Sequence, residues 1–337
     1  MSWKTQLRAD PLPWLLEKES PGVRYLALRD LAGLDTGNAE LRSARKVAHR
    51  SGPIAAILNR MQPAGYWVKP GPGYLPKYRS TVWSIIMLAQ LGAAVGEDKR
   101  IATAVSYLLD HGLAEGGQFT ASGAPSGTAD CLQGNLSRAL LDLGCGDPRL
   151  DFAFEWMART VTGEGLAPVG DRQAERRYYA GKCGPDFACG SNNKQSCAWG
   201  GVKVMLAFGA LPQVRRTPLI NRAIRRGADF LLGVDPADAN YPSGYASKPS
   251  GNWWKFGYPV FYVTDLLQNV QALLSLGYGG DRRLARALEF IRDKQDERGR
   301  WALEYDYTGK TWTGWGNKRE PNKWVTLRAL QVLKAAG

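Results

Sequence analysis

The stretch that decides the fold is residues 286–301, which read Arg-Ala-Leu-Glu-Phe-Ile-Arg-Asp-Lys-Gln-Asp-Glu-Arg-Gly-Arg-Trp. From Ala287 to Gln295 the apolar residues recur at helical spacing, which predicts a buried stripe that ends in a polar amide. Gly299 lets the chain turn back sharply, and the indole of Trp301 is expected to pack under the turn. Similar spacings recur upstream, so we interpret the stretch as one copy of a repeat and predict stacked helical hairpins.

Two kinds of predicted helix alternate along the chain. One kind is amphipathic and precedes a Gly-x-aromatic corner, whereas the other is more uniformly apolar, follows a long loop and ends at a glycine. A uniformly apolar helix can be buried on most of its faces and an amphipathic one on a single face. We therefore predict an all-α fold of inner helices ringed by outer ones, in a single domain over residues 1–337, with an open superhelix as the alternative. The glycines expected at the ends of the inner helices are Gly33, Gly92, Gly144, Gly209, Gly277 and Gly337.

The pattern Arg-Ala-x-x-Phe-Ile-x-x-x-Gln-x-x-x-Gly-x-Trp at 286–301 closely resembles the QW repeat of squalene and oxidosqualene cyclases. A half copy stands at Met61–Trp67. Through its repeat period the whole chain resembles the prenyltransferase and squalene-cyclase repeat superfamily. The resemblance implies an (α/α)6 toroid, with an active site in the central cavity at the end where the inner helices begin.

The chain departs from the bacterial cyclases of this superfamily because it has no Asp-x-Asp-Asp motif. The stretch Asp235–Asp238 is broken by a proline. However, Thr128-Ala129-Asp130-Cys131 opens a predicted inner helix and is similar to the Ser-Asp-Cys-Thr-Ala-Glu of oxidosqualene cyclases, whose Asp starts cyclisation as an acid. It also resembles, more loosely, the Asp/Cys zinc-ligand region of protein prenyltransferases, although their His ligand has no counterpart among His49 and His111.

Two carboxylates are candidate acids. Asp130 is expected at an inner-helix N-terminus, where it would either cap the helix or face an apolar cavity as a general acid. Burial would raise the pKa of the carboxyl and keep it protonated, while the helix dipole would oppose this. Asp265 occupies the corresponding place on another inner helix, so both carboxylates could converge in the cavity.

Four thiols are predicted to meet at the same end of the molecule. Cys131 and Cys197 begin consecutive inner helices, and Cys183 and Cys189 lie in the loop that leads into Cys197. Cys145 is expected at the far end of its helix. One interpretation is a metal held by the four cysteines, with zinc as the expected ion and no other cofactor. A disulfide and unliganded thiols are the open alternatives.

A net charge of +13 favours an anionic partner. The loops before the inner helices interleave cations with aromatic rings, among them Tyr178 and Tyr179, and this combination suits a hydrophobic or prenyl-type molecule with an anionic group. Arginine clusters at 222–226 and 282–283 indicate a solvated face or a peripheral contact with an anionic membrane. Nucleic acid is not an expected partner, because zinc-finger, RRM and KH motifs are lacking. The predicted substrate-binding residues are Tyr78, Arg79, Trp83, Trp199, Lys255, Tyr262 and Lys323.

The chain shows no signal-peptide pattern in Met1–Asp10 and no apolar run of about 20 residues. We therefore expect a cytoplasmic protein, with a membrane-peripheral location as the alternative.

The predicted function is that of an isoprenoid-processing enzyme of the terpene cyclase or prenyltransferase type, with Asp130 or Asp265 as its acid. Two alternatives stay open. One is a carbohydrate-active (α/α) barrel, a glycosidase or lyase, that uses Glu304 and Asp306 as paired carboxylates. The other is a non-catalytic toroid that binds a ligand or partner.

Overall fold

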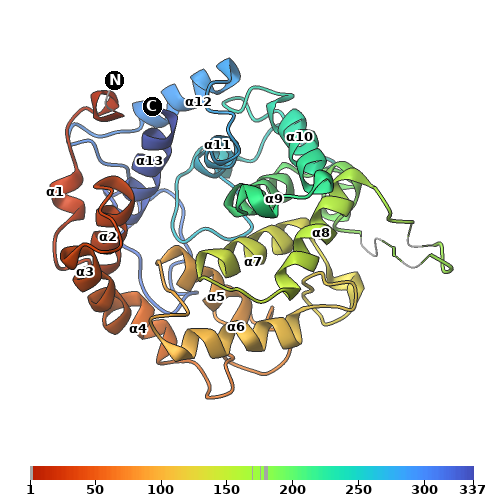
Figure 1. Ribbon diagram of the computed structural model, residues 1–337. Helices are drawn as coiled ribbons and strands as arrows, with labels where there is room; N and C mark the ends of the chain where they lie inside the picture. Colours follow the sequence, from red (N-terminus) through yellow and green to blue (C-terminus); the bar gives the residue numbers. More distant parts are fainter. Residues whose placement is uncertain (1–2, 169, 175, 178–180) are drawn as a thin grey trace.

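Helices dominate the computed structural model of this protein, which describes residues 3–168, 170–174, 176–177 and 181–337 (Figure 1). Tyr178 and Tyr179, predicted to lie at the cavity mouth, fall outside the described residues. The α-helices are α1 Leu12–Leu15, α2 Pro21–Leu26, α3 Ala39–Arg50, α4 Gly52–Leu58, α5 Thr81–Gln90, α6 Lys99–Gly112, α7 Asp130–Asp142, α8 Arg149–Thr162, α9 Ala198–Ala210, α10 Pro218–Leu232, α11 Leu266–Ser275, α12 Ala285–Asp293 and α13 Lys323–Ala336.

Short elements connect these helices. A π-helical turn, η2 Ala27–Leu31, continues α2. The 3-10 turns are η1 Trp3–Gln6, η3 Pro125–Gly127, η4 Pro185–Phe187, η5 Gly190–Asn192, η6 Gln213–Arg215, η7 Gly251–Trp254 and η8 Arg282–Leu284. Within the described residues the strands are β1 Ala188–Cys189 and β2 Gln195–Ser196, which pair antiparallel with Cys189 opposite Gln195. The predicted all-helical class is confirmed.

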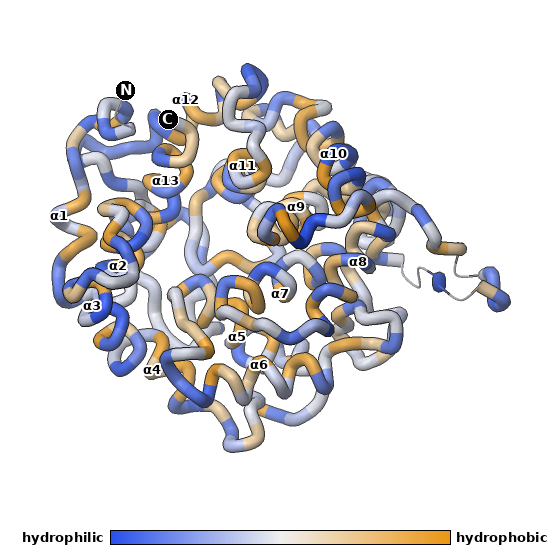
Figure 2. Tube along the Cα trace, in the orientation of Figure 1, coloured by the Kyte–Doolittle hydropathy of each residue, from blue (hydrophilic) through white to orange (hydrophobic). Residues whose placement is uncertain are grey.

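The uniformly apolar helices lie inside. α5 packs against α7, α7 against α9, α9 against α11, α11 against α13, and α13 against α2 and η2. The amphipathic helices α3, α6, α8, α10 and α12 each pack on one of these from the outside, as Figure 1 shows. The Cα trace coloured by hydropathy shows apolar segments on the inner helices and polar residues on the periphery (Figure 2).

The burial of single helices follows their sequences. In α5 every residue from Thr81 to Ala89 is buried. In α10 the buried residues recur at spacings of three and four, from Ile220 to Leu232, so that only one face is covered. The buried apolar side chains of the described residues form one continuous cluster from Leu15 to Leu333.

Two tryptophan corners tie outer helices to the inner helices that follow them. Trp67 and Trp301 are both buried, and each indole N–H donates 2.8 Å to a carbonyl ten residues earlier, that of Ile57 and Ile291 respectively. The backbone N–H of Trp67 also donates to Thr81 Oγ1, and that of Trp301 donates to an equivalent threonine on α13. Neither tryptophan lines the cavities described below, which agrees with their predicted role as corner residues.

The predicted helix ends are correct for five glycines and wrong for one. Gly337 directly follows α13. Gly33, Gly92, Gly144 and Gly277 follow inner helices and adopt positive φ. Gly209 instead lies inside α9, which ends at Ala210. A Cβ at Gly209 would lie 1.9 Å from Ser275 Oγ, so the glycine permits the close approach of α9 and α11 rather than a turn.

Among the described helices, none combines the length and the apolar composition needed to cross a membrane.

Candidate functional site

A cavity of about 350 Å³ lies where α5, α7 and α9 begin. Its volume falls in the range of about 300–1,000 Å³ that is typical of small-molecule sites. The predicted site residues Asp130, Trp83, Trp199 and Tyr262 line it, together with three of the predicted cysteines. We call it the aromatic cavity. Its polar and aromatic lining residues are Tyr74, Lys77, Trp83, Asp130, Cys131, Asn135, Lys182, Cys189, Ser191, Cys197, Trp199 and Tyr262.

Aromatic side chains hold one another in place along one wall. Tyr74 and Trp83 contact each other with ring centroids 5.1 Å apart, and the indole N–H of Trp83 donates 2.7 Å to the carbonyl of Tyr74. The hydroxyls of Tyr78 and Tyr262 lie 2.8 Å apart. Lys77 Nζ lies 4.9 Å from the centroid of the Tyr262 ring, so a cation stands over the aromatic wall.

Asp130 is the first residue of α7 and is 3% exposed. Neither carboxyl oxygen has a hydrogen-bond partner among the described residues. Burial raises the pKa of this carboxyl well above its usual range, and the neighbouring Cys189 adds to the effect. The N-cap of α7 is Ala129 rather than Asp130, so the capping role is not realised. This environment favours the protonated form of the acid at the wall of the cavity.

Two glycines bring α7 and α9 into close contact around this acid. A Cβ at Gly134 would lie 2.2 Å from the backbone of Lys203, and one at Gly200 would lie 3.0 Å from Cβ of Asp130. The helix starts are therefore held side by side, which places the N-terminus of α9 next to the carboxyl.

The cysteines of the β1–β2 hairpin form a hydrogen-bonded pair. The Cys197 thiol donates to Cys189, and this bond, aided by the backbone N–H groups of Ser191 and Asn192 and working against burial, lowers the pKa of Cys189 to about 6. The same pairing raises the pKa of Cys197 above its usual value. Burial, and to a smaller extent the nearby Asp130, raises the pKa of Cys131 to about 11. The cavity therefore holds one thiolate, on Cys189.

The four predicted thiols lie in one neighbourhood, because burial and the nearby Asp130, Cys189 and Cys131 together raise the pKa of the Cys183 thiol. Cys131, Cys189 and Cys197 line the cavity, whereas Cys183 is buried and is not among the lining residues. Within the described ranges, no group of three or more His, Cys, Asp and Glu side chains is arranged to hold a metal ion. No step below uses a metal. Zinc stays a prediction that elemental analysis of protein purified without chelators can test.

Asp265 has a different environment from Asp130. It caps α11 by accepting from the backbone N–H of Gln268 at 2.9 Å, and it accepts two hydrogen bonds from Arg328. It is not among the residues that line the aromatic cavity. The structure thus gives Asp265 the capping role that the sequence suggested for Asp130.

Three predicted substrate-binding cations lie outside the cavity lining. Arg79 donates to the carbonyl of Gly309 and lies over the Trp312 ring. Lys323 pairs with Glu17 at 2.6 Å, and Lys255 is exposed. The cations that do line the cavity are Lys77 and Lys182, which belong to the same loops.

The carboxylates of the carbohydrate-active alternative both have partners. Glu304 accepts from the Phe256 backbone N–H and pairs with Lys294, while Asp306 pairs with Lys318. Neither lines the aromatic cavity.

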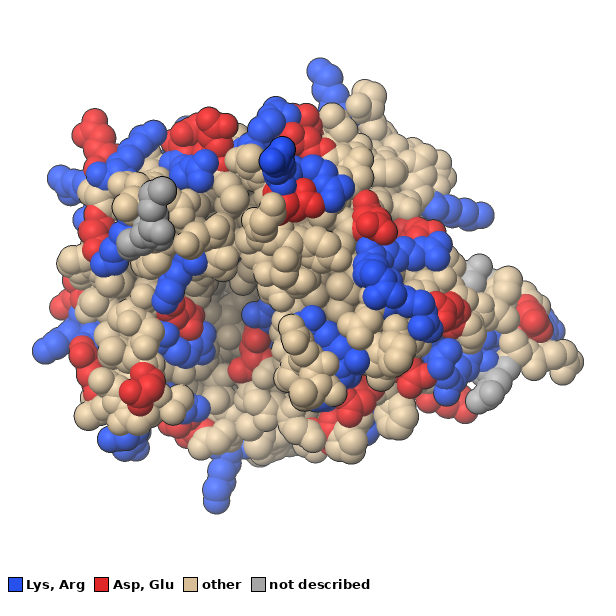
Figure 3. Space-filling view, turned by 45° about the horizontal axis from the view of Figure 1, so that its top comes forward, with Lys and Arg blue, Asp and Glu red and all other residues tan. Residues whose placement is uncertain are grey.

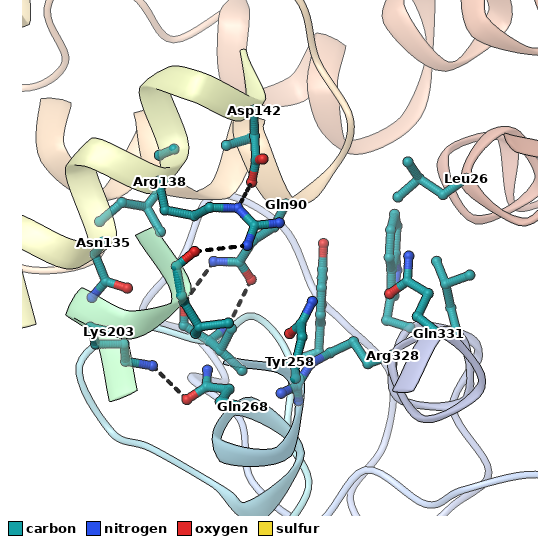
Figure 4. Close-up of a pocket in the computed structure, with 18 of the residues that line it drawn as sticks. Leu26, Gln90, Asn135, Arg138, Asp142, Lys203, Tyr258, Gln268, Arg328 and Gln331 are labelled. Carbon is teal, nitrogen blue, oxygen red and sulfur yellow. Dashed lines mark hydrogen bonds and ion pairs between the residues drawn. The ribbon is translucent and has the colours of Figure 1, made fainter. Parts of the chain in front are cut away.

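A second, polar cavity of about 200 Å³ lies deeper along the inner helices. Asn135 and Ile86 line both cavities. Figure 4 shows Lys203 pointing at Gln268, with Arg138 and Arg328 nearby. Sequence reasoning missed this site, although a single lysine within the apolar run Gly201–Phe208 was a usable signal.

The molecular surface mixes charges of both signs. In Figure 3 Lys and Arg lie among Asp and Glu, and the face is hollowed near its middle. In the predicted arginine clusters, Arg222 pairs with Glu164, Arg226 with Asp186, and Arg283 with Asp281. These pairs favour the interpretation as a solvated face.

No protein-family model and no curated protein matches this chain. A solved structure described as a protein from Actinoplanes is 14% identical to this chain. The match covers 87% of this chain and 99% of that chain, with a TM-score of 0.30. At that TM-score the likeness supports no conclusion about fold or function.

Proposed function

We propose that the inner helices close into an (α/α)6 toroid and that the protein is an isoprenoid-processing enzyme acting in the aromatic cavity. The neighbour contacts from α5 through α13 to α2, with an outer helix on most inner ones, support the ring. The observation that carries the function is the carboxyl of Asp130, which is buried at an aromatic wall and has no hydrogen-bond partner among the described residues.

The cavity suits an apolar chain with an anionic end. Tyr74, Trp83, Trp199 and Tyr262 offer aromatic surface for the chain. Lys77 is exposed and lines the same cavity, and none of the ion pairs between described residues involves it. Its ammonium can therefore bind a diphosphate without first breaking an ion pair with a described residue.

The proposed reaction begins with proton transfer. Neutral Asp130 gives its proton to a carbon–carbon double bond of the substrate, which leaves a carbocation on the substrate and a carboxylate on the protein. Faces of the surrounding aromatic rings stabilise the cation, and the first N–H groups of α7 stabilise the carboxylate. Loss of a proton from the rearranged cation to that carboxylate regenerates the acid, so the overall change is a cyclisation or isomerisation.

The test is product analysis by gas chromatography and mass spectrometry after incubation with squalene, farnesyl diphosphate and geranylgeranyl diphosphate. Asp130→Asn should abolish product formation, because an amide cannot supply the proton. Asp110→Asn is the matched control: this carboxylate is exposed on α6 and should be dispensable. Products made equally by Asp130→Asn, or neither product nor binding with any of the three compounds, would reject the proposal.

A further inference from the structure

Lys203 is the cation of the polar cavity that forms no ion pair with a carboxylate among the described residues, although Asp265 lies close enough to favour its charged form. The three guanidiniums that line this cavity each have one: Arg138 pairs with Asp142, Arg328 with Asp265, and Arg29 with Asp30. Lys203 is 1% exposed, and none of the ion pairs between described residues includes it. Its Nζ donates instead to the neutral amide oxygen of Gln268, at 2.5 Å.

Hydrogen-bond donors are also in excess at this point. Gln268 is 1% exposed, and because its Oε1 accepts from Lys203, only its Nε2 amide group is left to seek an acceptor. That Nε2 is buried and has no partner among the described residues. An ammonium carries three N–H donors, so Lys203 retains two. A buried donor without an acceptor destabilises the protein, and an acceptor supplied by a ligand would remove that cost.

We propose that the polar cavity is a binding site for a small oxyanion, a carboxylate or phosphate, held by Lys203 Nζ and Gln268 Nε2. The inference is independent of the function proposed for the aromatic cavity. A volume of about 200 Å³ holds about six or seven waters, which suits a compact anion rather than a lipid chain. The amide of Asn135 and the guanidinium of Arg328 line the same space and add donors.

Binding should depend on pH. Burial lowers the pKa of Lys203 to about 7, so without a ligand the amine loses its proton near neutrality. An oxyanion favours the protonated form. For succinate, whose carboxylates stay largely ionised over this range, affinity should fall about tenfold from pH 6 to pH 8, since the protonated fraction of Lys203 falls by about that factor, whereas phosphate itself gains negative charge near neutrality. The charged and titratable groups that face Lys203 or its cavity are Arg29, Cys131, Arg138, Asp142, Tyr258, Asp265 and Arg328.

Isothermal titration calorimetry of the full chain with succinate and, separately, inorganic phosphate tests the proposal. At pH 6 at least one of them should bind, and the ratio of the two Kd values tells a carboxylate site from a phosphate site. Lys203→Met should raise Kd at least tenfold while keeping the fold, because it replaces a buried amine by an apolar side chain of similar length. Lys99→Met, an exposed lysine at the start of α6, is the matched control and should leave Kd unchanged.

Gln268→Leu gives a second test, because it removes the unpartnered donor and should also weaken binding. Binding of neither anion at pH 6, equal Kd values for Lys203→Met and the parent, or an affinity for succinate that does not change between pH 6 and pH 8 would each overturn the proposal. The pH series uses the parent protein, so it decides the matter even if a variant misfolds.

Discussion

Arg328 on α13 donates two hydrogen bonds to the carboxylate of Asp265 at the start of α11, from Nη1 at 2.9 Å and from Nη2 at 3.0 Å. Both side chains are largely buried, with exposures of 12% and 6%. Because Asp265 also caps α11, one carboxylate joins two neighbouring inner helices.

Asp265→Asn should therefore lower the free energy of unfolding by about 3–5 kcal/mol, since it leaves the Arg328 charge buried without a counter-charge. Urea denaturation followed by circular dichroism measures this. Asp281→Asn breaks an exposed pair with Arg283 and should change stability little. If the two variants unfold at the same urea concentration as the parent, the ion pair is not a structural link.

The Trp301 corner should be a second point of stability. Trp301→Ala should cost about 3–5 kcal/mol because a large side chain with 1% exposure is lost. Trp301→Phe keeps most of the apolar contact but leaves the Ile291 carbonyl without its donor, so its loss should be smaller. Thermal unfolding of the two variants beside the parent measures the difference. A Trp301→Ala protein that melts like the parent would show that the corner does not hold the helices.

The sequence was sufficient for features that depend on local chemistry. The alternation of uniformly apolar and amphipathic segments predicted which helices are inner, since a helix such as α5 has no polar face to expose. The corner pattern predicted burial of Trp67 and Trp301, because a glycine two residues before a tryptophan allows a sharp turn under which the indole packs. The sequence also predicted that Asp130 lies near Cys131, Cys189 and Cys197, since each of them stands at the start of an inner helix or in the loop that leads to one.

Features that depend on distant partners could not be predicted. Asp130 and Asp265 look alike in sequence, yet an arginine 63 positions after Asp265 gives that residue an ion pair, while Asp130 has no such partner. The contact of Lys203 with Gln268 joins residues 65 positions apart, so neither residue signals the polar cavity alone. The partner of Lys323 could not be predicted for the same reason, because Glu17 engages it from the other end of the chain.

Cys189 should be the most reactive thiol of the protein near neutral pH. Its pKa of about 6 makes it mostly thiolate at pH 7, when ordinary thiols are mostly protonated. The rate of alkylation by iodoacetamide can be followed for each cysteine peptide by mass spectrometry. For Cys189 this rate should increase with pH along a titration curve whose midpoint lies near pH 6. Cys145, whose pKa burial raises, should react slowly throughout and serves as the internal control.

Removal of the Cys197 thiol tests whether the hydrogen bond from Cys197 sets the pKa of Cys189. Cys197→Ala takes away the main donor to the thiolate, so the midpoint for Cys189 should move up toward the usual thiol value of about 8.5. An unchanged midpoint would mean that the pair does not set the reactivity of Cys189.

The cation at the cavity mouth should decide binding of an anionic substrate. Lys77→Glu should weaken binding of geranylgeranyl diphosphate about tenfold or more, because a hydrogen bond to a charged group contributes about 1.5–3 kcal/mol and the new carboxylate repels the diphosphate. Affinity for the parent should fall as salt is added, since Lys77 is exposed and its charge is screened. Quenching of tryptophan fluorescence measures both effects, because Trp83 and Trp199 line the cavity.

Lys255→Glu is the matched control: it reverses an exposed charge that does not line the cavity, so it should retain the parent affinity. Equal weakening by the two variants would mean that general surface charge, rather than Lys77, attracts the anion.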